Sequence, residues 1–231
     1  QADWPDAAVV YPDGKRQYLD AMPLVNAASA LSTDVPFSFV YGKKPSAELL
    51  PKWKRSRRKL AAAEGIESEV VTCSDPATGL QVACEVKQFA GFEAVEWVLR
   101  LRNQGTADTP IIEKILPLDL HLDAATSADV VLHYANGSSC QPDDFAPLEH
   151  AVGPKESFTL APVGGRSSNG RLPFFNFRWG QEGLVGAIGW SGQWQLRVAR
   201  AGGRQVALRA GQQTTHLKLH PGESIRTPRI L

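Results

Sequence analysis

The residues best suited to chemistry gather between Gly164 and Trp194. In this span, Arg166 and Asn169 belong to a Gly-Gly-Arg-Ser-Ser-Asn loop, and Trp190 and Trp194 flank a Ser-Gly turn. Guanidinium and amide groups bond hydroxyls, and an indole offers a flat apolar surface. Sugar sites combine such polar groups with aromatic planes, so these four residues are the candidate substrate-binding set. Core packing is the alternative for at least one tryptophan, and an Asn-Gly pair is also a common turn.

Catalytic machinery is harder to find than binding groups. A glycosidase needs two carboxylates that flank the scissile bond, and the carboxylates of this chain do not suggest such a pair. Asp143 and Asp144 follow a Gln-Pro dipeptide, where Asp side chains commonly bond the local backbone; direct ligand contact is the alternative. The Gly-Trp-Ser-Gly run at 189–192 superficially resembles a nucleophile elbow, but a strand-to-strand turn is favoured. We therefore nominate no catalytic residue.

Metal and cofactor signatures are not visible in the sequence. The five histidines are scattered without ligand spacing, and no phosphate loop or dinucleotide fingerprint occurs. We therefore expect no metal site and no cofactor.

Cys73 and Cys84 lie symmetrically about a turn at 75–79, and a hairpin there would place them opposite one another. A disulfide in an oxidising compartment and two buried thiols both remain open, and Cys140 is left over.

The composition is that of a soluble globular protein without a charged partner. The 231 residues are 43% hydrophobic and 21% charged, with a formal net charge of +1. The basic run from Lys52 to Lys59 is predicted to be a solvated helix or loop face rather than a nucleic-acid site. No apolar run approaches the ~20 residues that cross a bilayer. Because the chain begins at Gln1, through signal removal or cloning, a secreted or periplasmic location is favoured over the cytoplasm.

Strands dominate the expected secondary structure. Only Ala47 to Ala63 resembles a helix, beginning near Pro51 and stopping before Gly65. Alternating apolar residues and intervening turn residues predict strands at 69–74, 80–89, 93–103, 111–122, 130–134, 156–160, 174–179, 184–190, 193–200, 205–209 and 214–219. Many strands without interleaved helices predict an all-β fold, a large antiparallel sandwich with one short helix and a single domain over 1–231.

An ordered series of motifs resembles the N-terminal β-supersandwich domain of glycoside hydrolase family 36-type α-galactosidases, a galactose-mutarotase-like fold. Residues 144–148 resemble its Asp-Phe-x-Pro-Leu segment. Residues 165–174 resemble its Arg-x-Ser-His…Asn-Pro-Phe stretch, with Ser168-Asn169 where many members carry Ser-His. The similarity extends over residues 185–194, with a Tyr-Ser-Gly-Asn-Phe-like turn, over 217–228, with a Pro-Gly-Glu…Thr-Pro signature, and over 36–50, which looks like a divergent bacterial branch.

The resemblance implies a role inside a larger enzyme. The nucleophile and acid/base of that family are two Asp residues on a separate (β/α)8 barrel, which would begin where this chain stops at Leu231. No residue here matches either Asp, so we expect this chain alone to be inactive. The resemblance further implies that the domain packs on the barrel, contributes to the rim of a site for galactoside-type carbohydrates, and takes part in homo-oligomer contacts.

Two other functions stay open. The first is a free-standing carbohydrate-binding module, which would use the same four residues. The second is a small mutarotase-like enzyme, which needs a His acid and a carboxylate base in one cleft. His133 with Glu149 or Glu113 is the pairing that the sequence offers, without support from spacing.

Overall fold

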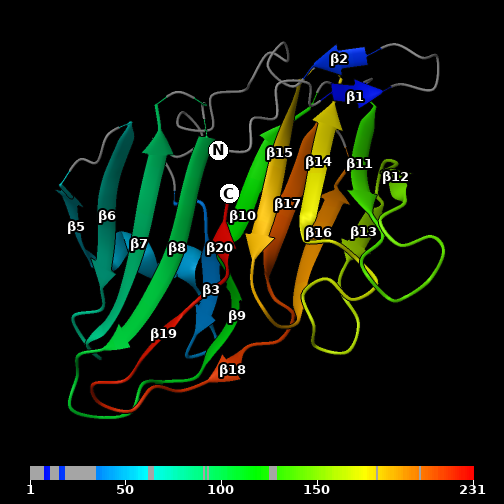
Figure 1. Cartoon of the computed structure of the whole chain (residues 1–231). Helices are drawn as coiled ribbons and strands as arrows, with labels where there is room; N and C mark the ends of the chain where they lie inside the picture. The colour runs from blue at the N-terminus through cyan, green and yellow to red at the C-terminus, as the bar shows by residue number, and fades with distance from the viewer. Residues whose placement is uncertain are drawn as a thin grey trace.

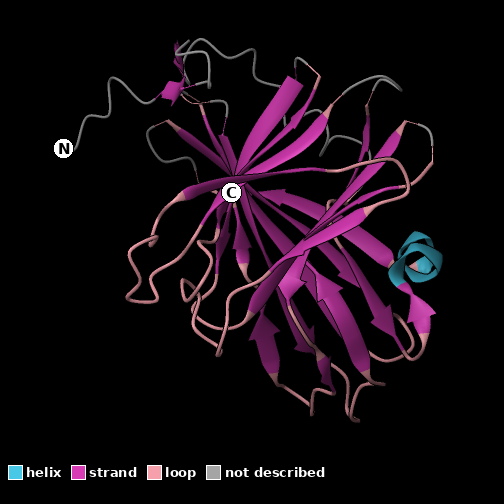
Figure 2. Cartoon of the chain, turned by 90° about the vertical axis from the view of Figure 1, so that its right-hand side faces the viewer, coloured by secondary structure: helices cyan, strands magenta, loops and turns pink. Residues whose placement is uncertain are grey.

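Antiparallel strands make up almost all of the structure, a computed structural model that describes residues 8–10, 16–18, 35–61, 65–90, 92, 94–124, 129–180, 182–202 and 204–231. Within these described ranges the one α-helix is the short α2 (Ser46–Leu49), which runs into a 3-10 turn, η2 (Leu50–Lys52), and lies at the margin of the molecule in Figure 2. The strands are β1 (Ala8–Val10), β2 (Arg16–Tyr18), β3 (Ser38–Tyr41), β4 (Lys44–Pro45), β5 (Lys54–Lys59), β6 (Ile66–Ser74), β7 (Leu80–Phe89), β8 (Ala94–Asn103), β9 (Ile112–Leu116), β10 (Leu118–Asp123), β11 (Val130–Ala135), β12 (Pro147–Ala151), β13 (Ser157–Leu160), β14 (Phe174–Trp179), β15 (Glu182–Gly189), β16 (Trp194–Arg200), β17 (Gln205–Gln212), β18 (His216–Leu217), β19 (Ser224–Arg226) and β20 (Arg229–Ile230).

One large sheet organises the molecule. It has ten strands in the order β12-β11-β14-β15-β20-β8-β7-β6-β5, with β19 paired to β8 beside this path. Two four-stranded sheets, β10-β17-β16-β13 and β18-β9-β3-β4, complete the sandwich. Figure 1 shows β5 to β8 on one side of the C-terminus and β14, β15, β11 and β12 on the other. The predicted all-β antiparallel sandwich is therefore confirmed.

Alternation in the sequence explains the central strands. In β8, Val95, Trp97, Leu99 and Leu101 all point into the core, as the period of two predicts. The indole N–H of Trp97 donates to the Pro117 carbonyl at 2.7 Å, which ties β8 to the opposite layer. The predicted strand 93–103 begins at Ala94 in the structure, and Glu93 lies outside the described residues.

The predicted single strand at 111–122 is two strands. Pro117 separates β9 from β10, and the two join different four-stranded sheets. Proline lacks the N–H that a continuous ladder would use, so the chain changes sheet at this position.

The helix expected between Ala47 and Ala63, with its start near Pro51, is wrong, because the observed helix ends before Pro51. The α-helix ends at Leu49, a 3-10 turn containing Pro51 follows, and the chain then extends into β5. Ala62 and Ala63 lie outside the described residues. The basic run therefore forms an edge strand, not the expected helix or loop face, and all six β5 side chains are exposed. Charged edge strands resist pairing with other chains, which accounts for the composition of this segment.

Cys73 and Cys84 are not directly opposite one another in the hairpin, contrary to the prediction. In the β6–β7 ladder, Cys73 lies opposite Val82, and Cys84 lies opposite Val71. The two cysteines are thus offset diagonally on the same buried face, and both are free thiols. The turn closes between Asp75 and Leu80, which moves the centre of the hairpin away from the midpoint of the two cysteines.

Candidate functional site

The candidate residues Arg166 and Asn169 lie in the loop between β13 and β14, at residues 161–173. Asn169 closes this loop on itself: its side-chain N–H donates to the Val163 carbonyl at 2.8 Å, and its backbone carbonyl accepts from the Val163 N–H at 2.9 Å. Gly164 and Gly170 adopt positive φ angles of 69° and 76°, which permit the tight path. The amide of Asn169 is therefore committed to the loop.

The turn between β15 and β16, residues 190–193, fastens this loop from one side. Gln193 accepts from the Gly165 N–H at 2.9 Å and donates to the Pro162 carbonyl at 2.6 Å. The indole N–H of Trp194 donates to the Ser167 carbonyl at 2.8 Å. These bonds bring the two parts of the sequence span from 164 to 194 into direct contact, as the candidate set required.

A third loop, residues 136–146 between β11 and β12, approaches from the other side. The Ser138 N–H donates to the Ser168 carbonyl at 2.8 Å, and Arg171 Nη1 donates to Asn136 Oδ1 at 2.6 Å. A Cβ at Gly137 would lie 1.9 Å from the Ser168 oxygen, so the backbones meet only because this residue is glycine. We call residues 136–146, 161–173 and 190–193 the loop cluster.

The two tryptophans of the candidate set have different roles. Trp194 is 0% exposed, so it presents no face on which a sugar ring could stack. Its contribution is to hold the loop through the bond to Ser167. Trp190 is half-buried, and the Arg226 guanidinium lies 5.6 Å from its ring centroid, in cation–π contact.

Arg166 is the exposed member of the set. Its side chain makes no hydrogen bond or ion pair with any described residue. The loop cluster thus presents the guanidinium of Arg166, without a partner among the described residues, beside the turn that carries the half-buried Trp190. Sequence reasoning missed Gln193 and Arg171 because single polar residues beside glycines carry no periodic signal.

Asp143 and Asp144 accept hydrogen bonds from groups within their own loop, residues 136–146. Asp144 accepts hydrogen bonds from the N–H groups of Ser139 and Cys140, both at 2.9 Å. These bonds, the backbone bond from Ser139 foremost, lower the pKa of Asp144 below its ordinary value. Asp143 accepts from the Asn136 side chain at 2.9 Å. Asp144 therefore bonds the local backbone as expected, whereas the carboxylate of Asp143 bonds the side chain of Asn136 in the same loop.

Of the two acid–base pairings suggested by the sequence, the structure brings His133 together with Glu149. His133 and Glu149 are cross-strand neighbours on β11 and β12, with Nδ1 and Oε2 3.6 Å apart. Burial lowers the pKa of His133, and the charge of Glu149 acts against that shift. Glu149 has a largely exposed side chain, and Glu113 instead contacts His216 on another sheet at 2.9 Å.

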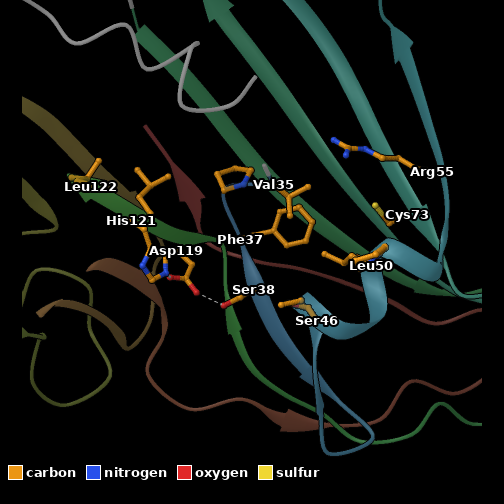
Figure 3. Close-up of a pocket in the computed structure, with 14 residues that line it drawn as sticks. Val35, Phe37, Ser38, Ser46, Leu50, Arg55, Cys73, Asp119, His121 and Leu122 are labelled. Atoms are coloured by element: carbon orange, nitrogen blue, oxygen red, sulfur yellow. Dashed lines mark hydrogen bonds and ion pairs between the residues drawn. The ribbon is translucent and has the colours of Figure 1, made fainter. Parts of the chain in front are cut away.

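A groove of about 670 Å³ lies away from the loop cluster, between β3, α2, β6 and β10 (Figure 3). Asp119 is at one end, where its carboxylate accepts from Ser38 Oγ at 2.6 Å and from Arg209 Nε at 2.8 Å. His121 Nε2 lies 3.4 Å from the same carboxylate. Because the carboxylate stands between the serine and the histidine, the group is not arranged to activate Ser38 as a nucleophile. The groove is lined by Val35, Pro36, Phe37, Ser38, Ser46, Ala47, Leu50, Pro51, Arg55, Cys73, Asp119, Leu120, His121 and Leu122.

Within the described part of the chain, no group of three or more His, Cys, Asp or Glu side chains is placed to hold a metal ion. Among the same residues, no helix has the length and apolar character needed to cross a bilayer.

Solved structures of glycoside hydrolase family 36 α-galactosidases have the same fold. The enzyme AgaA from Geobacillus stearothermophilus, solved with stachyose, matches 84% of this chain with a TM-score of 0.61 and 14% identity. The α-galactosidase from Lactobacillus brevis matches 84% with a TM-score of 0.62 and 13% identity. The galactosidase domain of the α-galactosidase-sucrose kinase AgaSK matches 99% with a TM-score of 0.60 and 13% identity.

The match covers only part of each of these enzymes. This chain spans 29% of the AgaA chain, 28% of the Lactobacillus brevis enzyme and 34% of the AgaSK domain. No protein-family model and no curated protein matches the sequence. The resemblance drawn from the motifs is thus confirmed at the level of the fold.

Proposed function

We propose that this chain is the non-catalytic N-terminal sandwich domain of an α-galactosidase-like retaining glycoside hydrolase. A (β/α)8 barrel beyond Leu231 supplies the two catalytic Asp residues in this proposal. The convergence of three family-like stretches carries the argument. Residues 144–148, 165–174 and 185–194 are separate in the sequence, yet they contribute to or adjoin one loop cluster. The fold match to family 36 α-galactosidases supports the same conclusion.

The loop cluster then shapes the rim of the sugar site. Arg166 offers a guanidinium without a partner among the described residues, and the turn that carries Trp190 contacts the Arg166 loop through the hydrogen bond between Gln193 and Gly165. Structures of neighbours were solved with stachyose and raffinose, and galactosides of that kind are the proposed substrates here. The fixed backbone of the cluster, rather than a mobile loop, would hold Arg166 in place for this contact.

Turnover of a nitrophenyl α-galactoside tests the proposed division of labour. The isolated chain should give no turnover, and a longer polypeptide that continues from Leu231 into the barrel should be active. Robust turnover by the isolated chain would overturn the proposal. So would a continuation that encodes no barrel with an Asp nucleophile.

Substitution of Arg166 tests the rim assignment in the longer polypeptide. Arg166→Ala should raise KM for raffinose about tenfold, the value of one hydrogen bond from a charged group. Arg58→Ala removes another exposed arginine, on β5, and should leave KM unchanged. Equal KM values for the two variants would remove Arg166 from the rim.

A free-standing carbohydrate-binding module is the second candidate, favoured by the uncommitted Arg166 within the isolated chain. Calorimetry with galactose and raffinose distinguishes it. Saturable binding by this chain alone, weakened in both Arg166→Ala and Trp190→Ala, would support the module. Absence of binding at millimolar sugar would favour the rim role.

A further inference from the structure

The outer face of the large sheet carries an exposed apolar patch beside the loop cluster. Phe174 on β14 is 59% exposed, Val185 on β15 is 60% exposed, and Leu231 is 48% exposed. Large apolar side chains are scattered on any surface, but contiguous ones mark sites of contact. Whether these three are contiguous follows from the strand register.

The register places all three side chains on one face. Phe174 pairs with Ala187, and Asn176 pairs with Val185, so Phe174 and Val185 stand on the same side of β14 and β15. Leu231 exchanges both backbone hydrogen bonds with Ala187, at 2.9 and 3.1 Å. The apolar side chains of Phe174, Val185, Ala187 and Leu231 therefore form one cluster, which we call the outer patch.

Charged side chains border the outer patch on the β8 side. Glu96 forms an ion pair with Arg229 and lies 3.6 Å from Lys87 Nζ. Arg229 directly precedes Ile230 and Leu231. An apolar centre with a polar border is the usual anatomy of a protein–protein contact.

We propose that the outer patch is the docking face for the catalytic barrel, an inference that rests on the proposed function. The patch is continuous with the loop cluster, because Phe174 follows Pro173 and the turn at 190–193 follows β15. Under the proposed function, the polypeptide continues from Leu231, which is itself part of the patch. Figure 1 shows this terminus in the middle of the large sheet, between its two halves.

The size of the missing partner agrees with this assignment. In the solved neighbours, the matched region is 28 to 39% of the chain, so most of each enzyme lies outside it. Under the proposed function, the barrel covers a face near the loop cluster, because the loop cluster shapes the rim of its sugar site. In this assignment, β14, β15 and the C-terminal residue contact the barrel. The loop cluster lies at the edge of this contact, where it reaches the rim of the sugar site.

Hydroxyl-radical footprinting of the isolated chain and of the longer polypeptide tests the assignment. Oxidation of Phe174 should fall about fivefold or more in the longer polypeptide, as expected for a side chain moved into an interface core. Phe92 is 79% exposed near the β7–β8 turn and is the matched control, which should be oxidised equally in both.

The outcomes separate this inference from the proposed function. Equal oxidation of Phe174 in a longer polypeptide that hydrolyses the nitrophenyl galactoside would overturn the docking face and leave the proposed function standing. An inactive longer polypeptide would defeat both. Concentration-dependent dimerisation of the isolated chain that Phe174→Ser abolishes would assign the patch to a second copy instead, which also overturns the inference.

A substitution gives an independent readout. Because Phe174 and Val185 are exposed, the Phe174→Ser/Val185→Ser variant should leave the Tm of the isolated chain within about 3 °C of the parent. In the longer polypeptide, the same variant should shorten the half-life of activity on heating, and Phe92→Ser should not. Equal half-lives for the two variants would count against the docking face.

Discussion

The side chains of the loop cluster, together with the adjoining Trp194 on β16, divide into those that hold the loops and those that face solvent. Asn169, Gln193 and Trp194 make hydrogen bonds to backbone groups of the loop at 161–173. Arg166 does not, so its loss costs the loop no bond. Function at this site is therefore best tested by changing Arg166, because changes at the other three residues would disturb the scaffold as well.

Asp144 gives the loop cluster an acid-sensitive contact. Its pKa is lowered in the folded chain by hydrogen bonds from backbone N–H groups, that of Ser139 foremost. A carboxyl with a depressed folded pKa stabilises the protein above its unfolded pKa, and this contribution disappears as the pH falls through the folded value. The relevant window lies below about pH 4, the unfolded value for Asp.

We therefore expect Asp144→Asn to lower Tm at neutral pH and to match the parent at strongly acidic pH. Scanning calorimetry of both proteins across this range measures the convergence. Asn keeps one acceptor oxygen, so the difference reports the charge rather than the loss of all the bonds. Curves that stay parallel down to the acid limit would show that the carboxylate contributes nothing to stability.

The three cysteines should differ sharply in reactivity. Burial raises the pKa of Cys84 to about 12, and the pKa of Cys73 is also raised by burial. Cys140 is exposed. Because the thiolate is the reactive form, an aromatic disulfide reagent at about pH 8 should modify one thiol in the native chain and three after unfolding without reductant. A single reactive thiol after unfolding would instead reveal a disulfide between Cys73 and Cys84.

At the scale of elements, the sequence predicted strands where side chains alternate and failed where they do not. The bounds of β7 and β14 are those expected, because each strand has one buried and one outward face. β5 has no alternation, since all six of its side chains are exposed. β20 has two residues, and its pairing with β15 and β8 depends on contacts far away in the sequence. Local patterns cannot report such contacts.

The candidate site was likewise predicted in part. The span 164–194 supplied two of the three loops because aromatic and polar residues concentrate there. The third loop joins through the close approach of Gly137 to Ser168, which depends on the three-dimensional path of both backbones. The burial of Trp194 follows from its place on β16, opposite Gln212, and not from its distance to the turn.

The basic edge strand β5 should keep the molecule monodisperse. Arg57 pairs with Glu69 at 3.2 Å, an exposed contact worth less than about 1 kcal/mol. The charges are therefore more important for repelling other strands than for stability. Replacing Arg55, Arg57 and Arg58 by Val should cause concentration-dependent association in static light scattering.

The matched control is the same triple change to Gln, which removes charge without adding apolar, β-branched side chains. Association should then be absent or much weaker. If the Val variant stays monodisperse at every concentration tested, the edge is protected by some feature other than its side chains.

At the scale of the whole molecule, β20 connects the two halves of the large sheet. β15 and β8 are not neighbours, and the sheet order passes from one to the other through Arg229 and Ile230. Ile230 is 2% exposed and lies opposite both Ile188 and Trp97. Two residues thus complete a hydrogen-bonded surface that runs the full width of the sandwich.

Truncation measures this connection. A chain ending at Pro228 should lose about 3 kcal/mol or more of unfolding free energy. The space of the buried Ile230 side chain is then left empty, and backbone groups of β15 and β8 lose their hydrogen-bond partners. A chain ending at Ile230 keeps the connection and should lose much less. Chemical denaturation of the three lengths provides the comparison, and equal losses for both truncations would contradict the role of β20.

The late position of β20 has a consequence for how the protein is made. The N–H of Leu99 in β8 donates to Thr227 Oγ1, a partner 128 residues further along the chain. Contacts of such long range form slowly and only after both partners exist. During synthesis, one edge of β8 and one edge of β15 stay unpaired until residues 227–230 have left the ribosome. Between the synthesis of each strand and that point, the open edges of β8 and β15 are the sites on this domain that chaperones would bind.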